Sequence, residues 1–226
     1  MADRGPVLDL RGYLADWSRL HGGYDPADST VVRAWLTLSY TLGRPFAVLR
    51  VPPDLVTLLG ALASGVVVWL SWLGGGWLAA AALVVALSGV LDSLDGAVAV
   101  ISGRTTRWGY VLDSLVDRVS DTFYLAALWV VGAPGWLCVL GGVLMGLHEY
   151  SRARAGNAGM GEIGVITVWE RPTRIILTAL VLLSGAIHQS SAQTLVTGGA
   201  AAWVVLGAVG LTQLLVVVRR RLRAPP

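Results

Sequence analysis

Apolar residues occur along this chain in long runs that are separated by short polar or glycine-containing segments. A helix of about 20 apolar residues is long enough to cross the hydrocarbon core of a bilayer. We count six such runs, and the pattern therefore predicts an all-α, polytopic membrane protein with six transmembrane helices. The predicted spans are residues 55–73, 77–98, 110–131, 136–151, 175–187 and 195–218.

The first fifty residues differ from the rest because they are mainly polar and lack the short apolar core of a cleavable signal peptide. Within them, residues 29–48 mix Val, Trp, Leu and Tyr with Arg33 and Arg44. This mixture predicts an amphipathic helix in the membrane interface, although an ordinary soluble helix fits equally well. The chain thus divides into an N-terminal segment (1–50), a six-helix domain (51–218) and a basic tail (219–226).

The arginines fall in four groups, and these groups set the predicted orientation. The chain has 17 basic residues, all of them arginine, and a net charge of +3. With six spans, every group falls on one side of the membrane, and positively charged segments stay in the cytoplasm. We therefore expect an integral protein of the inner (cell) membrane, with both termini and the active site facing the cytoplasm. The groups occupy residues 4–50, 104–118, 152–174 and 219–223.

Composition narrows the classes of function. Hydrophobic residues make up 55% of the chain and charged residues only 14%, whereas soluble domains carry roughly 25% charged residues. Basic residues that flank apolar spans are typical of membrane topology, so we expect membrane lipid and no nucleic acid as a partner. Cys138 is the single cysteine, which excludes an intramolecular disulfide and a cysteine-based metal site.

Four aspartates stand where the second predicted span ends and the third begins. Asp92 and Asp95 lie three residues apart and Asp113 and Asp117 four apart, so each pair shares one face of a helix. A carboxylate at membrane depth costs about 2.5 kcal/mol or more, and such residues usually mark function. Two such faces can converge on a divalent cation, and the oxygen ligands favour Mg²⁺ or Mn²⁺.

With the small residues between them, these aspartates resemble the signature of the CDP-alcohol phosphotransferase family. Seven of the eight fixed positions of that signature match at the family's spacing. The departure is Val100, where the family has arginine, and Arg104 or Arg107 could substitute for it. The matching residues are Asp92, Asp95, Gly96, Ala99, Gly109, Asp113 and Asp117.

The resemblance implies transfer of a phosphatidyl group from a CDP-linked lipid, CDP-diacylglycerol, to a small alcohol, with release of CMP. Two ions of Mg²⁺ or Mn²⁺ would be held by the four aspartates, and Asp117 would also serve as general base beside the acceptor hydroxyl. Gly96, Ala99 and Gly109 would make room for the CDP moiety. A homodimer is likewise expected from the family.

Residues 149–174 resemble the acceptor-side segment of the family, and phosphatidylinositol phosphate synthases in particular. Guanidinium groups bind phosphate bidentately, so we expect an acceptor that carries a phosphate, with inositol phosphate as the first choice. Glycerol 3-phosphate and an unphosphorylated alcohol such as serine are the alternatives. Arginines at span ends also set topology and meet anionic headgroups. The candidates for the acceptor phosphate are Arg152, Arg154, Arg171 and Arg174.

Two hypotheses from other classes stay open. Aspartates inside a membrane also line ion pathways, so a transporter would explain the acids, although not their spacing with the small residues. A family member that had lost activity through Val100 would survive as a structural subunit. Metal-dependent release of CMP from CDP-diacylglycerol would separate the enzyme from a transporter.

Overall fold

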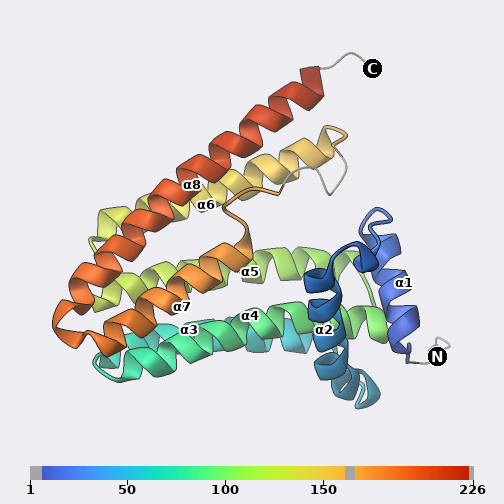
Figure 1. The fold of residues 1–226 in the computed structure, drawn as a ribbon, viewed down its shortest axis with the longest axis horizontal. Helices are drawn as coiled ribbons and strands as arrows, with labels where there is room; N and C mark the ends of the chain where they lie inside the picture. Colours follow the sequence, from blue (N-terminus) through green and yellow to red (C-terminus); the bar gives the residue numbers. More distant parts are fainter. Residues whose placement is uncertain (1–6, 161–165, 224–226) are drawn as a thin grey trace. The chain divides into compact units, whose positions relative to one another are not determined.

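The computed structural model describes residues 7–160 and 166–223, which form helices joined by short connections and contain no strand (Figure 1). This confirms the predicted all-α class. Two short 3₁₀ helices, η1 (Pro26–Asp28) and η2 (Gln189–Ser191), accompany the longer helices. The α-helices are α1 (Leu10–Leu20), α2 (Thr30–Val48), α3 (Pro53–Leu73), α4 (Trp77–Ile101), α5 (Arg107–Val131), α6 (Gly135–Asn157), α7 (Arg171–Ile187) and α8 (Ala192–Arg223).

Helices α3 to α8 lie at the six predicted spans, with ends that differ by several residues. By length and composition, three helical segments among the described residues could cross a membrane: Pro53–Leu73, Trp77–Ile101 and Gln189–Arg223. Helix α7 has only 17 residues, and α5 and α6 carry several charged side chains. A membrane-spanning position of α5, α6 and α7 therefore stays a prediction. The predicted tail begins inside α8, and residues 224–226 lie outside the described residues.

The chain forms two compact parts, and α3, α4 and α5 contribute residues to both. The first part contains the residues up to 62 together with residues 87–117. The second part contains residues 63–86 and the residues from 118 onward. All four aspartates of the signature belong to the first part, and all four candidate arginines belong to the second.

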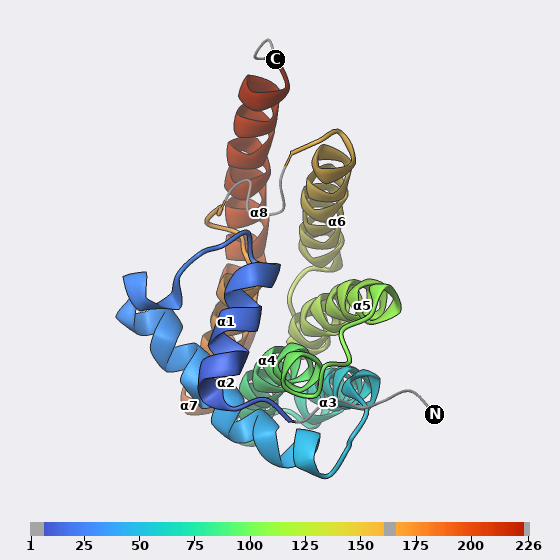
Figure 2. The same ribbon diagram turned by 90° about the vertical axis from the view of Figure 1, so that its right-hand side faces the viewer.

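In the first part, the N-terminal helices pack against the end of α4. Asp9 caps α1, because its Oδ1 accepts a hydrogen bond of 2.8 Å from Gly12 N, and a cap of this kind favours helix initiation. The backbone N–H of Leu8 donates to the carbonyl oxygen of Ile101 at 2.9 Å, and Tyr13 is buried in an apolar cluster with α4 residues. Figure 2 shows α1 beside α2. Sequence reasoning had not predicted α1.

Helix α2 occupies the segment for which an amphipathic helix was predicted. It begins after Ser29, whose Oγ accepts from Val32 N. Its buried residues recur every three or four positions, which is the spacing of one helix face. At Gly43 a Cβ would contact α4 side chains at 3.5 Å, so α4 packs close to this face. Apolar side chains on other faces, including Val31 and Trp35, are exposed.

In the second part, α8 packs along α6 and α7, and Figure 1 shows α6 and α8 side by side. Small residues allow the close approach. A Cβ at Gly207 would lie 3.2 Å from Leu144 Cβ, and a Cβ at Gly199 would lie 2.7 Å from Val181 Cγ1. The apolar core of this part includes the completely buried Trp169 and Trp203.

Candidate active site

Three of the four predicted metal ligands lie together in the first part of the chain. Asp92 on α4 and Asp113 and Asp117 on α5 each offer a carboxylate oxygen, and these oxygens lie within 4.8 Å of one another. All three residues are half-buried. Oxygens at this separation can bind one common cation. The two helix faces that the spacing predicted therefore converge at these residues.

Asp95 is the fourth predicted ligand and lies outside this group of three. Asp95 is 5% exposed, and its Oδ1 accepts a hydrogen bond of 2.5 Å from Gly96 N. Its Oδ2 is buried and has no hydrogen-bond partner among the described residues. A buried carboxylate oxygen without a donor is costly unless a cation satisfies it. The donor set, which consists only of carboxylate oxygens, therefore fits Mg²⁺ or Mn²⁺.

The small residues of the signature differ in the space that surrounds them. Gly96 is exposed, and a Cβ placed on it would meet no described atom within 4 Å. Gly109 is more crowded: it donates its N–H to Thr106 Oγ1 at 2.9 Å, and a Cβ on Gly109 would lie 3.1 Å from that oxygen and 3.8 Å from Asp54 Oδ1. Ala99 is half-buried. Sequence reasoning had not singled out Asp54, which lies in the first turn of α3.

Val100, which stands where the family signature has arginine, packs into the apolar cluster of the first part. It is 8% exposed and shares this cluster with Tyr13 of α1. Of the two predicted substitutes, Arg104 donates from Nη1 to the carbonyl oxygen of Arg50 at 3.3 Å. Arg107 is exposed at the start of α5. Residues of α1, α2 and α4 thus bury the position at which the family signature has arginine.

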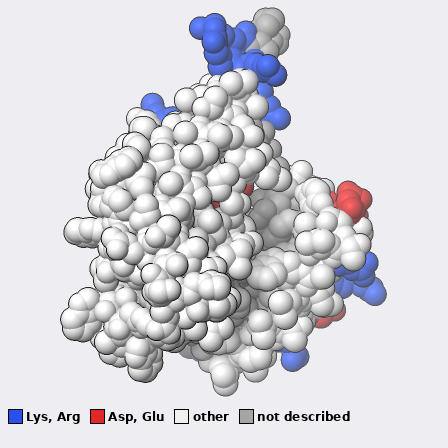
Figure 3. All heavy atoms as spheres, turned by 60° about the vertical axis from the view of Figure 1, so that its left-hand side comes forward, with Lys and Arg blue, Asp and Glu red and all other residues white. Residues whose placement is uncertain are grey.

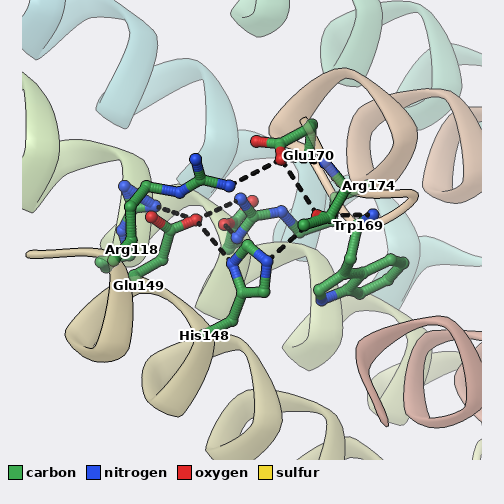
Figure 4. A network of polar contacts seen from close by, with 9 residues as sticks. Arg118, His148, Glu149, Trp169, Glu170 and Arg174 are labelled. Atoms are coloured by element: carbon green, nitrogen blue, oxygen red, sulfur yellow. Dashed lines mark hydrogen bonds and ion pairs between the residues drawn. The ribbon is translucent and has the colours of Figure 1, made fainter. Parts of the chain in front are cut away.

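In the second part, a buried ionic network ties α5, α6 and α7 together (Figure 4). Arg174 of α7 is 1% exposed; its Nη1 donates to Asp121 Oδ2 at 2.6 Å and its Nη2 to Glu149 Oε1 at 2.7 Å. Arg118 Nη1 lies 3.2 Å from the same Glu149 oxygen. Sequence reasoning singled out Arg174 as a candidate for the acceptor phosphate and did not pair it with either carboxylate.

A second set of contacts in this network centres on Glu170, the residue before α7. Its Oε1 accepts from Arg152 Nη2 at 2.6 Å, from Thr167 N at 2.8 Å and from Thr167 Oγ1 at 3.0 Å. His148 is completely buried, and its Nε2 lies 3.1 Å from Thr167 Oγ1. The structure therefore brings Arg152 and Arg174 into one region.

The two other candidate arginines lie at helix ends. Arg154 is exposed in the last turn of α6. Arg171 is half-buried at the first position of α7, near Arg174. This region contains more arginines than carboxylates, so it keeps a net positive charge that suits a phosphate dianion. The arginines are Arg118, Arg152, Arg171 and Arg174, and the carboxylates are those of Asp121, Glu149 and Glu170.

Charged side chains are scarce on the face that Figure 3 shows, and arginines gather at the C-terminal end of α8. A surface with few charges next to a basic helix end is typical of a protein that lies in a membrane.

A model of the CDP-alcohol phosphatidyltransferase family matches residues 50–214, a range that contains every predicted site residue. The chain belongs to the CDP-alcohol phosphatidyltransferase family. The members of this family that resemble the chain include several inositol phosphate lipid synthases. Over 204 residues, the chain is 32% identical to the phosphatidylinositol phosphate synthase of Streptomyces avermitilis, covering 83% of this chain and 81% of that protein. Over 150 residues, it is 32% identical to the archaetidylinositol phosphate synthase of Pyrococcus horikoshii, covering 65% of this chain and 77% of that protein.

Solved structures of one transferase resemble the fold of the chain. The crystal structure of the Mycobacterium tuberculosis phosphatidylinositol phosphate synthase with bound CDP-DAG aligns with a TM-score of 0.67 at 27% identity, covering 80% of this chain and 94% of that one. The same enzyme in complex with manganese and citrate aligns with a TM-score of 0.66 at 28% identity, covering 80% and 88%.

Proposed function

We propose that this chain transfers the phosphatidyl group of CDP-diacylglycerol to inositol phosphate and releases CMP. The observation that carries the proposal is the group of carboxylates from Asp92, Asp113 and Asp117, which occupy positions of the family signature. Relatives named as inositol phosphate lipid synthases, and a similar structure with CDP-DAG bound, support the choice of substrates.

The four aspartates of the signature would hold two ions of Mg²⁺ or Mn²⁺. When bound, these ions would neutralise the diphosphate and lower the pKa of the acceptor hydroxyl. Asp117 accepts the proton of that hydroxyl while the hydroxyl oxygen of the acceptor forms a bond to the lipid-side phosphorus. The bond from this phosphorus to the bridging oxygen breaks, and that oxygen leaves with CMP. Gly96, Ala99 and Gly109 would lie beside the CDP moiety, and the open space at Gly96 supports this placement.

For the acceptor phosphate, Arg152, Arg154 and Arg171 are the direct candidates, because a guanidinium group matches phosphate geometry bidentately. Arg174 was also among the arginines predicted from the sequence to bind the acceptor phosphate. Its Nη1 and Nη2 donate to Asp121 and Glu149, so we assign it to holding α5, α6 and α7 in register rather than to a direct phosphate contact.

In the membrane, we propose that α3 to α8 are the six spans and that α2 lies in the interface. Helix α8 has 32 residues, more than the about 20 that a span requires, so its basic end extends beyond the hydrocarbon core. The arginine groups favour a cytoplasmic position for both termini and for the site. We further propose a homodimer, as expected for the family.

The test is incubation of the purified protein with CDP-diacylglycerol, Mg²⁺ and a panel of acceptors, with CMP and lipid products followed by mass spectrometry. Inositol phosphate should give the fastest CMP release, ahead of glycerol 3-phosphate and serine. Asp117→Asn should abolish transfer and leave the unfolding temperature close to that of the wild type, whereas the exposed control Asp28→Asn should keep full activity. Substantial turnover by well-folded Asp117→Asn would contradict the role of this residue as a base.

A further inference from the structure

One tryptophan anchors residues 166–170, which directly precede α7. Trp169 is completely buried, although it belongs to no helix. It packs against α8 where Gly207 and Gly210 provide the space: a Cβ on Gly210 would overlap the Trp169 side chain, and a Cβ on Gly207 would lie 3.4 Å from its Nε1. The ring of Trp203 meets the Trp169 indole edge-on, with centroids 4.9 Å apart.

The polar groups of the same segment hold an arginine in place. We call residues 166–170 the docked segment. Its Thr167 hydroxyl donates to Glu170 Oε1, accepts from Trp169 N at 3.2 Å, and lies 3.1 Å from His148 Nε2. The same Glu170 oxygen accepts from Arg152. These bonds are mutually satisfied when His148 carries its proton on Nε2.

The docked segment is also tied to α8 by its backbone. Val168 N donates to Gln213 Oε1 at 3.1 Å, so the segment contacts α8 through one buried ring and one hydrogen bond. Glu170 is the residue that precedes α7, which begins with Arg171. The position of the docked segment therefore sets both the partner of Arg152 and the start of α7.

We propose that Trp169 and Thr167 are positioning residues for the acceptor phosphate: they lock the docked segment onto α8, and through Glu170 they orient Arg152 toward the phosphate. This inference rests on the proposed function. A guanidinium group that is already oriented loses less conformational freedom when it binds phosphate. A small misplacement of a binding group can also slow a reaction strongly.

The test compares two glycines of α8. Alanine has a higher helix propensity than glycine. Gly210→Ala should therefore impair acceptor binding only through the overlap of its Cβ with Trp169. Gly198→Ala is the matched control, because its Cβ would meet no described atom within 4 Å. With initial rates of CMP release, Gly210→Ala should raise the KM for inositol phosphate by about tenfold or more, and the KM for CDP-diacylglycerol should stay unchanged. Gly198→Ala should match the wild type in both.

A second pair of variants covers the case in which Gly210→Ala does not fold. Thr167→Val keeps the shape of the side chain but removes the hydroxyl, whereas Thr167→Ser keeps the hydroxyl. We expect Thr167→Val to raise the acceptor KM and Thr167→Ser to restore it. Equal changes in the two KM values, or identical values for Val and Ser, would overturn the positioning role.

Binding of inorganic phosphate separates this inference from the proposed function, because it requires no turnover. Phosphate should raise the unfolding temperature of the wild type and of Gly198→Ala, but much less that of Thr167→Val. An equal rise in all three proteins, or no rise in any of them, refutes the inference. Absence of CMP release by the wild type with every acceptor refutes the proposed function instead.

Discussion

Replacement of Arg174 by methionine tests the buried ionic network most directly. The substitution keeps a side chain of similar length and removes two charge-assisted hydrogen bonds, one to Asp121 and one to Glu149. Each bond of this type contributes about 1.5–3 kcal/mol, and removal of one partner of a buried ion pair costs about 3–5 kcal/mol. Asp121 is completely buried, so water cannot compensate for the lost cation.

The expected effect is a large fall in thermal stability. For a chain of this size, 1 kcal/mol corresponds to about 2–4 °C, so Arg174→Met should lower the unfolding temperature by about 6–20 °C. The assay is thermal unfolding in detergent micelles, followed by the intrinsic fluorescence of the ten tryptophans. The unfolding temperature of Arg174→Lys should lie between those of the wild type and Arg174→Met. A single ammonium group cannot bind both carboxylates as the two ends of a guanidinium group do.

Two comparisons decide whether this reasoning is correct. The control Arg154→Met removes an exposed arginine and should change stability by less than about 0.5 kcal/mol. The double variant Asp121→Asn/Arg174→Met should be less destabilised than the sum of its single changes, by a coupling of about 0.5–3 kcal/mol. An unfolding temperature of Arg174→Met equal to that of Arg154→Met would refute a stabilising network.

Two further predictions concern the carboxylates and the N-terminal helices. Removal of divalent cations with EDTA should abolish CMP release, and addition of Mn²⁺ or Mg²⁺ should restore it. Activity that persists after chelation would show that the carboxylates of Asp92, Asp113 and Asp117 need no metal. Val100→Arg should lower the unfolding temperature and fail to raise activity, because the new charge would enter the apolar cluster around Tyr13; a marked gain of activity would show instead that the missing arginine limits the natural chain.

Sequence patterns were sufficient for features that depend on near neighbours along the chain. The lengths of the apolar runs predicted helices α3 to α8, since a helix that is buried in lipid must be apolar over most of its length. The spacing of Asp113 and Asp117 placed both carboxylates on one face of α5, because residues four apart lie one above the other. Helix α1 was missed because its packing also depends on the end of α4, which lies far along the sequence.

Only the tertiary structure decided which charges meet. Arg174 is separated by 53 residues from Asp121 and by 25 from Glu149, and no periodicity relates positions on three different helices. The same holds for Trp169 and Gly210, whose contact requires α8 to return beside the docked segment. The sequence determined which helices form and which residues share a helix face, because those properties follow from local geometry. The partners of each buried charge and ring were decided by the packing of the helices against one another.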